Sequence, residues 1–306
     1  MAAVIFREIL EQNPTTEIYM VTRKNFADLF ADIPNVKFIG VELDEYKGFL
    51  GLRKLTKKLI QEINPDYIAD LHDVIRSKII SKGFKRNGFK VYVLDKGKQE
   101  KDELTDVWNL DKKPLKRTVE RYADVFRKIG LQVELSHKYR PTTTEKSGVG
   151  FAPFAQHKGK VLPLEKSFEV ANEIAKHKKV YFFGGGKEEK EILELWEKQI
   201  PNTESLAGKL SLKEELAKIS TLETMISMDS ANMHLASLVG TRCVSVWGAT
   251  HPFAGFLGYG QSLDDVVQIS DLTCRPCSVF GDKECYRGDY ACLEELHSSK
   301  IIEKVL

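Results

Sequence analysis

Four side chains that could bind or transfer charged groups lie within six consecutive positions: Asp229, Ser230, Asn232 and His234. The apolar run "ETMISM" before them predicts a buried strand, and "SANMHLASLVG" predicts a helix. The side-chain oxygen of Asp229 or Ser230 can cap this helix, whose first N–H groups and positive dipole end also suit a phosphate. A plain N-cap beside a satisfied histidine is the structural alternative, but the four residues together favour ligand binding.

Two further segments place polar residues where a strand is expected to end. In "FAPFAQHKGKVLP" (151–163) a polar turn holds Lys158 and Lys160, and a lysine here could neutralise a leaving diphosphate. A solvent-facing turn lysine is the alternative. "FFGGGKEEKE" (182–191) has a glycine turn between strand and helix, but it matches neither the P-loop nor the GxGxxG pattern. By itself this turn is a weak indication of a site.

The elements that must position these residues alternate along the whole chain. Strands are expected at 16–22, 36–42 and 67–72 and again at 148–154, 179–186, 223–229 and 242–250, with helices between them. Such alternation predicts parallel βαβ units in two α/β domains, at 1–140 and 150–306, joined by a polar linker at 136–149. Ligands of such sheets bind beyond the carboxyl ends of the strands, so we expect the site in a cleft between the domains.

The sequence resembles glycosyltransferase family 9, the ADP-heptose:lipopolysaccharide heptosyltransferases and their relatives. The resemblance rests on "DSANMHLASLVGTRCVSVWGATHP", preceded at suitable distances by "FAPFAQHKGKVLP" and "FFGGGKEEKE". It implies the GT-B fold, in which two doubly wound Rossmann-like domains face a cleft, and an inverting sugar transfer that requires no cofactor or catalytic metal.

The resemblance also implies roles for residues that match the family's donor site. Lys160 corresponds to the lysine at the donor diphosphate, Glu188 to the acid at the nucleotide ribose, and Leu210 to the apolar residue on the base. The loop that holds phosphates and sugar corresponds to Asp229, Ser230, Asn232 and His234. Ala231 replaces the family's usual glycine, and Ala155 and Gln156 replace small hydroxyl residues, which leaves the identity of the donor open.

The first domain departs from the family at its start. Members of the family open with a strand and a loop whose aspartate is the proposed general base, whereas "MAAVIFREILEQ" predicts the helix that follows this loop. An inverting transfer needs a base to take the proton of the attacking hydroxyl. We therefore expect the catalytic aspartate, and the first strand of the domain, upstream of Met1 through truncation or start-codon choice. A degenerate enzyme is the alternative.

Charge and hydropathy indicate the partners and the compartment. The net charge is +2, but residues 51–100 hold 12 basic and 6 acidic side chains, which is either a solvated helix face or a surface for an anionic partner. Aromatic residues are not interleaved there, so we expect no nucleic acid. The absence of a signal peptide and of a membrane-spanning apolar run predicts a cytoplasmic protein. We expect it at the inner membrane, with candidate acceptor contacts at Arg76, Lys78, Arg117 and Arg121.

The cysteines allow two interpretations. Cys274 and Cys277 have metal-ligand spacing, and with Cys285 and Cys292 they could form a structural zinc or iron site. The second pair lacks the CxxC form, and reduced packing cysteines are the alternative, because disulfides are not expected in the cytosol.

The sequence as a whole predicts a transferase that moves a sugar, heptose from ADP-heptose, onto a phosphorylated lipopolysaccharide core or lipid A acceptor. Two rival hypotheses remain at this point. One is a non-catalytic protein that binds a nucleotide sugar, and the other is a different GT-B activity such as a nucleotide-sugar epimerase.

Overall fold

The computed structural model describes residues 1–140 and 145–306, which divide into two compact units. Unit 1 comprises Met1–Gly97 and Thr118–Ser136, and unit 2 comprises Lys98–Arg117 and His137–Leu306. Residues 98–117, which the sequence analysis places in the first domain, thus belong to unit 2. The expected linker 136–149 includes the boundary at Ser136, and its residues 141–144 lie outside the described residues. The resemblance implies that residues 1–140 form the acceptor-side domain and residues 150–306 the domain that binds the nucleotide-sugar donor, and this assignment stays a prediction.

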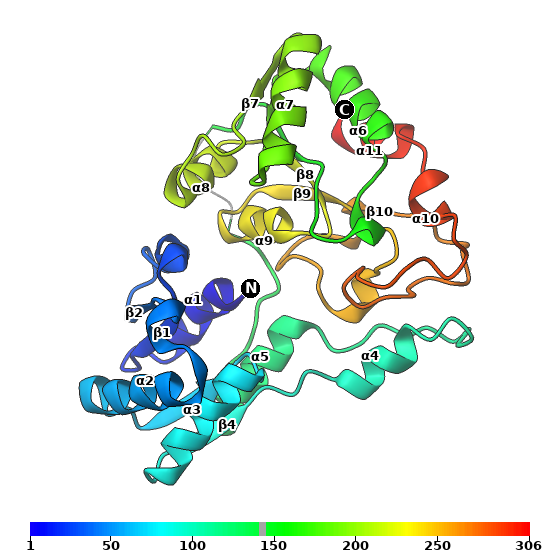
Figure 1. Ribbon diagram of the computed structural model, residues 1–306. Helices are drawn as coiled ribbons and strands as arrows, with labels where there is room; N and C mark the ends of the chain where they lie inside the picture. The colour runs from blue at the N-terminus through cyan, green and yellow to red at the C-terminus, as the bar shows by residue number, and fades with distance from the viewer. Residues whose placement is uncertain (141–144) are drawn as a thin grey trace. The chain divides into compact units, whose positions relative to one another are not determined.

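Unit 1 consists of short parallel strands and the helices that connect them (Figure 1). Its elements are α1 (Ala2–Gln12), β1 (Ile18–Arg23), η1 (Lys24–Leu29), β2 (Val36–Val41), η2 (Leu43–Tyr46), α2 (Gly48–Ile63), β3 (Tyr67–Asp70), α3 (Ile75–Arg86), β4 (Lys90–Val93) and α5 (Thr118–Ile129).

The strands of unit 1 form two separate parallel pairs. β1 pairs with β2 from Ile18 opposite Val36, and β3 pairs with β4 from Tyr67 opposite Lys90. The hydrophobic core beneath α2 and α3 gathers Val41, Tyr46, Leu55, Leu59 and Phe84. Helix α3 extends to Arg86 because apolar residues continue at helical spacing as far as the buried Phe84.

Unit 2 contains the longer alternation of strands and helices. Its elements are α4 (Lys98–Leu104), β5 (Val149–Ala152), η3 (Lys158–Lys160), α6 (Leu164–Ala175), β6 (Val180–Phe182), α7 (Lys187–Gln199), β7 (Thr203–Ser205), α8 (Leu212–Ser220), β8 (Thr224–Met228), α9 (Ala231–Leu238), β9 (Arg242–Val246), η4 (Pro252–Ala254), η5 (Leu263–Asp265), β10 (Val266–Val267), α10 (Ala291–Glu294) and α11 (Ser299–Val305).

The described strands of unit 2 form one parallel sheet in the order β10-β9-β8-β5-β6-β7. The sheet is doubly wound, because the order reverses between β5 and β8, which are neighbours from Val149 opposite Thr224 to Ala152 opposite Ser227. All five residues of β8 are buried, as expected for a central parallel strand covered on both faces. The carboxyl ends of β5 and β8 therefore open side by side at the switch point.

The two faces of this sheet carry separate cores, and the strand residues alternate between them. Phe151, Met228 and Val246 pack with residues of α6, α7 and α11 on one face. Met225 and Trp247 pack with residues of α8 and α9 on the other. This alternation is the period of two that a strand imposes, and it accounts for the predicted continuous apolar runs.

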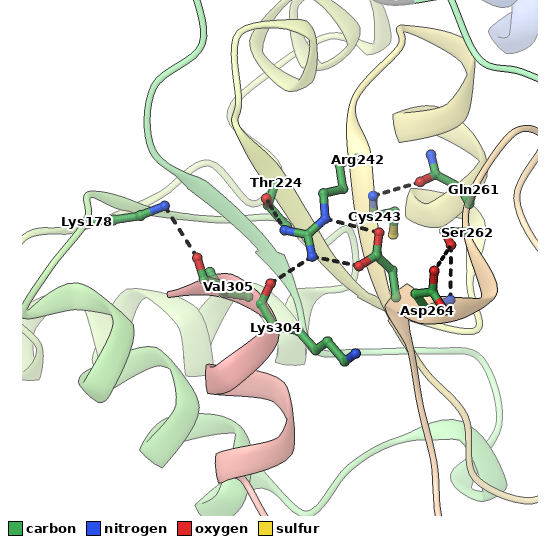
Figure 2. Close-up of polar contacts among 10 residues, drawn as sticks. Lys178, Thr224, Arg242, Cys243, Gln261, Ser262, Asp264, Lys304 and Val305 are labelled. Atoms are coloured by element: carbon green, nitrogen blue, oxygen red, sulfur yellow. Dashed lines mark hydrogen bonds and ion pairs between the residues drawn. The ribbon is translucent and has the colours of Figure 1, made fainter.

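Hydrogen bonds connect the end of the chain to the start of β9 (Figure 2). The guanidinium of Arg242 donates to both carboxylate oxygens of Asp265, at 3.0 and 2.6 Å, and to the backbone oxygen of Lys304 at 2.8 Å. Lys178 donates to the backbone oxygen of Val305 at 3.4 Å. These contacts hold α11 beside α6, as Figure 1 shows, and stabilise the sheet behind the site.

In the part of the chain that the structure describes, no helix has the length and apolar composition needed to cross a membrane.

Candidate functional site

A cavity of about 780 Å³ opens at the switch point of the unit 2 sheet. Its walls come from the segments that follow β5, β6 and β8, from α8, and from residues 256, 279, 280 and 282. The lining includes Lys160, Glu189, Glu215, Asp229, Ser230, Asn232, His234, Phe256, Phe280 and Asp282. Five of the seven predicted donor residues thus line one cavity, namely Lys160, Asp229, Ser230, Asn232 and His234. Their role in donor binding stays a prediction.

An ion pair joins the two sides of the switch point. Nζ of Lys160, after β5, lies 2.9 Å from Oδ2 of Asp229, after β8. The Lys160 side chain is largely buried and that of Asp229 almost wholly so. Moving the ammonium group away from Asp229 would leave a buried charge without its partner, which is unfavourable. The ion pair therefore fixes the position of the ammonium group in the cavity wall.

The start of α9 has no side-chain cap, contrary to the sequence prediction. Ser230 is the N-cap residue, but its Oγ lies 3.1 Å from Oγ of Ser227 and accepts no hydrogen bond from the first turn. The Asp229 carboxylate faces Lys160 instead. An ordinary helix start satisfies part of its first-turn N–H groups with a side chain. Here the N–H groups and the positive end of the helix dipole are left for an anion.

Besides Oδ2 of Asp229, which faces Lys160, two buried polar atoms near this helix start have no hydrogen-bond partner among the described residues. They are Oδ1 of Asn232 and Nδ1 of His234, both on residues that line the cavity. Burial lowers the pKa of His234 to about 3, and the positive charge of Lys160 acts in the same direction. The imidazole is therefore neutral at pH 7. A buried polar atom without a partner is costly, so both atoms point to a ligand that completes their hydrogen bonds.

The glycine turn before α7 is closed by its own helix. Oε2 of Glu189 accepts hydrogen bonds from the N–H groups of Gly185 and Gly186, at 2.8 and 3.3 Å. Glu189 lines the cavity, whereas Glu188, the predicted ribose acid, is exposed and lies outside the lining. Leu210, the predicted contact of the base, also lies outside it. Glu189 occupies the N3 position of α7, so the spacing of three residues from Gly186 could have identified it.

Other carboxylates that the sequence did not indicate complete the cavity wall. Glu215 comes from the first turn of α8, and burial raises its pKa. Asp282 accepts a hydrogen bond from the hydroxyl of Ser278 at 2.8 Å, and this bond lowers the pKa of Asp282. No local sequence pattern marks either residue, because each reaches the cavity only through the tertiary fold.

The stem of Lys160 is held by a close contact with a glycine. A Cβ on Gly281, which has a φ of +75°, would lie 2.7 Å from Cγ of Lys160. Nearby, a Cβ on Gly248 would lie 2.6 Å from the backbone oxygen of Gly159. Arg275 donates to the backbone oxygens of Trp247 and Thr250, at 3.1 and 2.9 Å, and so fixes this segment. Residues 275–281 therefore help to position the side chain of Lys160.

The candidate acceptor residues are divided between the units. Arg76 and Lys78 lie on α3 of unit 1, where both are exposed and Nζ of Lys78 lies 3.3 Å from Oδ1 of Asp73. Arg117 belongs to unit 2 and is partly buried. Arg121, in unit 1, is only 4% exposed and forms an ion pair with Asp95 at 3.7 Å. The acceptor role of all four stays a prediction.

The four late cysteines border one small cavity. Cys274, Cys277, Cys285 and Cys292 all line it, and all are free thiols. Within residues 1–140 and 145–306, no group of three or more His, Cys, Asp or Glu side chains could hold a metal ion. The structural zinc or iron site and its alternative, packing by reduced cysteines, both stay predictions. Burial raises the pKa of Cys292 to about 12, as expected for an inert thiol.

The fold and the cavity together define a class of protein. A doubly wound parallel sheet that opens an uncapped helix start and a buried lysine at its switch point is typical of domains that bind nucleotide phosphates. Comparison with known families makes this specific. Residues 52–286 match the family described as glycosyltransferase family 9 (heptosyltransferase), so the chain belongs to this family and is a glycosyltransferase.

Individual relatives are similar over nearly the whole chain. Lipooligosaccharide heptosyltransferase 2 of Campylobacter jejuni is 24% identical over all of this chain and 93% of its own length. Among solved structures, a family 9 glycosyltransferase from Veillonella parvula has a TM-score of 0.71 and 18% identity, over 99% of this chain and 92% of its own. The ADP-heptose lipopolysaccharide heptosyltransferase II of E. coli has a TM-score of 0.66 and 20% identity, with the same coverage. These likenesses confirm the predicted GT-B fold.

Proposed function

We propose that the protein transfers a heptose from ADP-heptose, with inversion, to a phosphorylated lipopolysaccharide core or lipid A acceptor. The observation that carries this proposal is the start of α9, where a helix without a side-chain cap faces a cavity beside the Lys160–Asp229 pair. Similarity to relatives named as heptosyltransferases supports the choice of sugar.

In the proposed reaction this site stabilises the leaving nucleoside diphosphate. Negative charge develops on the diphosphate as the bond to the anomeric carbon breaks. The Lys160 ammonium and the N–H groups of the first turn of α9 are already in place, so they stabilise that charge without reorganisation. The neutral His234 and Asn232 add hydrogen bonds. Side chains and a helix end supply this stabilisation, so the proposed reaction uses no metal or cofactor.

The remaining wall suits a ligand rich in hydroxyl groups. Glu189, Glu215 and Asp282 place carboxylates around a cavity that also contains one lysine. An ionised carboxylate only accepts hydrogen bonds, so it can bind ribose and sugar hydroxyls but repels phosphate. Phe256 and Phe280, whose rings lie 5.7 Å apart between centroids, supply apolar surface for a sugar or base. This division favours a nucleotide sugar over inorganic phosphate.

We assign the acceptor phosphates to basic residues, with Arg76, Lys78, Arg117 and Arg121 as candidates, and place the protein in the cytoplasm at the inner-membrane surface. The basic excess in residues 51–100 supports an anionic partner. Arg76 and Lys78 are the accessible candidates, since Arg121 is buried.

Titration of ADP into the protein tests the donor site. Lys160→Met should weaken ADP binding about tenfold, or about 1.4 kcal/mol, because it removes the fixed cation. Lys160→Met with Asp229→Asn avoids a buried unpaired acid and should bind ADP as weakly while remaining folded. Lys158→Met is the matched control, since Lys158 lies over the ring of Tyr290 and outside the cavity lining, and it should bind as the wild type does. Unchanged affinity in both Lys160 variants contradicts the site.

A transfer assay separates the proposed enzyme from its rivals. With ADP-heptose and a lipid A-type acceptor, the account expects release of ADP and a glycosylated acceptor. ADP binding without transfer favours a nucleotide-sugar binding protein, and a changed sugar without transfer favours an epimerase.

A further inference from the structure

One face of α2 combines positive charge with exposed apolar side chains. We call it the α2 outer face, and it consists of Lys47, Phe49, Leu50, Arg53, Lys54, Lys57 and Lys58, all exposed. Leu50 is 76% exposed and Phe49 52%, although both open a helix whose opposite side packs into the core through Leu52, Leu55 and Leu59. The guanidinium of Arg53 lies 5.7 Å from the centroid of the Phe49 ring. Two large apolar residues in water are unfavourable unless another surface covers them.

The charges of this face are only partly balanced. Lys47, the N-cap residue of α2, lies 3.0 Å from Oδ1 of Asp44. Glu62 is the acidic residue of α2, and its carboxylate lies 3.8 Å from Nζ of Lys58. No ion pair joins Arg53, Lys54 or Lys57 to a carboxylate among the described residues. Helix α7 shows the contrast, because its lysines lie beside acids one turn away, such as Lys190 at 3.7 Å from Glu194. The α2 outer face therefore projects a net positive field.

Helix α3 extends the same surface. It packs against α2 so closely that a Cβ on Gly83 would lie 2.7 Å from Cγ2 of Thr56. Each helix ends four residues before a strand, and these strands, β3 and β4, run parallel in register. Both helices therefore begin toward the carboxyl ends of these strands, where α3 starts with Ile75, which is 79% exposed. α3 contains no acidic residue and adds exposed basic side chains, including Lys82, Lys85 and Arg86.

We propose that the α2 outer face docks unit 1 onto an anionic phospholipid bilayer. Each basic side chain near such a surface is attracted to the anionic headgroups. The exposed apolar residues at the helix starts enter the boundary between headgroups and acyl chains, as amphipathic surface helices do. A soluble phosphate compound would use the charges but would leave Phe49 and Leu50 in water. The inference rests on the proposed function for its setting, since a lipid-linked acceptor lies in such a bilayer.

Co-sedimentation of the full chain with vesicles tests this inference. The probes are phosphatidylcholine vesicles with and without phosphatidylglycerol, at low and high salt. We expect binding to the anionic vesicles at least tenfold tighter than to the neutral ones, and weaker at high salt. Phe49→Ser with Leu50→Ser should lower the affinity at least tenfold, and so should Lys54→Glu with Lys57→Glu. The matched control is Leu195→Ser, which removes a similarly exposed leucine from α7 and should change nothing.

The outcomes separate this inference from the proposed function. Equal binding to neutral and anionic vesicles overturns it, and so does anionic binding that the α2 variants leave unchanged. Loss of binding in the charge variant but not in the Phe49 and Leu50 variant also overturns it, because the apolar residues are then not used. Vesicle binding is measured without donor or transfer, so it stands or falls independently. ADP titration and circular dichroism of each variant establish that unit 2 and the fold are intact.

Discussion

The β6–α7 and β8–α9 junctions leave the same edge of one sheet and line the same cavity. They differ in whether a side chain accepts hydrogen bonds from the backbone N–H groups at the helix start. At β6–α7, the Glu189 carboxylate accepts hydrogen bonds from Gly185 and Gly186. At β8–α9, Ser230 makes no capping bond, and the N3 position holds the buried Met233, which cannot supply one. A junction whose N–H groups are already paired has none to offer a diphosphate. A junction left open beside a buried lysine and two unpartnered polar atoms depends on a ligand.

If the β8–α9 junction binds the diphosphate with the help of Lys160, then moving the Lys160 side chain without removing it should weaken ADP binding. Gly281→Ala places a methyl group against the Lys160 stem, and overpacking of this kind costs about 1–3 kcal/mol. We expect ADP binding about tenfold weaker in calorimetry. Gly288→Ala is the matched control, because Gly288 has a similar φ of +81° but nothing near its Cβ. Its ADP affinity should equal that of the wild type.

A double-mutant cycle shows whether Gly281 acts through the lysine. Once Lys160→Met has removed the charge, adding Gly281→Ala should weaken ADP binding little further. Additive losses in the double variant, or equal losses in the Gly281 and Gly288 variants, would mean that the contact does not position Lys160.

The start of α8 is a third junction, and it can be compared with the start of α9. Ser211 there has a full capping box, in which Oε2 of Glu214 accepts from the Ser211 N–H at 2.8 Å and Ser211 Oγ accepts from the Glu214 N–H at 3.3 Å. Ser211→Ala should lower the free energy of unfolding by about 1 kcal/mol and leave ADP binding unchanged. Ser230→Ala should do the opposite, with a stability loss below about 0.5 kcal/mol and a measurable loss of ADP affinity. Equal stability losses in urea titrations would show that Ser230 is an ordinary cap.

The third and smallest effect concerns pH. Burial lowers the pKa of His234 from 6.5 to about 3, so between these values the unfolded chain binds a proton that the native state does not. The stability from this group is present above pH 6.5 and is lost as the pH falls toward 3. The unfolding free energy of His234→Gln should therefore decline less steeply between pH 7 and 5 than that of the wild type, by at most one proton in slope. Parallel profiles in urea titrations would contradict a neutral buried imidazole.

Much of unit 2 could be predicted from the sequence because its strands and helices have recognisable local sequence patterns. The buried strands are continuous apolar runs, and Ser211 with Glu214 has the spacing of the capping box that the structure confirms. Since carboxyl ends of parallel strands share an edge, the convergence of Lys160 with Asp229 also followed from the order of elements.

The parts that could not be predicted depend on choices between neighbours or on tertiary contacts. Glu188 and Glu189 are alike in sequence, and only the phase of α7 turns Glu189 inward. The predicted cap by Asp229 or Ser230 is wrong because an ion pair 69 residues distant in sequence draws the Asp229 carboxylate away. Residues 98–117 follow unit 1 in sequence but belong to unit 2, which no local pattern indicates.

The most direct test of the central claim is a crystal structure of the protein with ADP. The account predicts the diphosphate at the start of α9, with its oxygens within hydrogen-bond distance of the first-turn N–H groups and of Nζ of Lys160. A diphosphate bound at the Gly184–Gly186 turn, or away from unit 2, would contradict it.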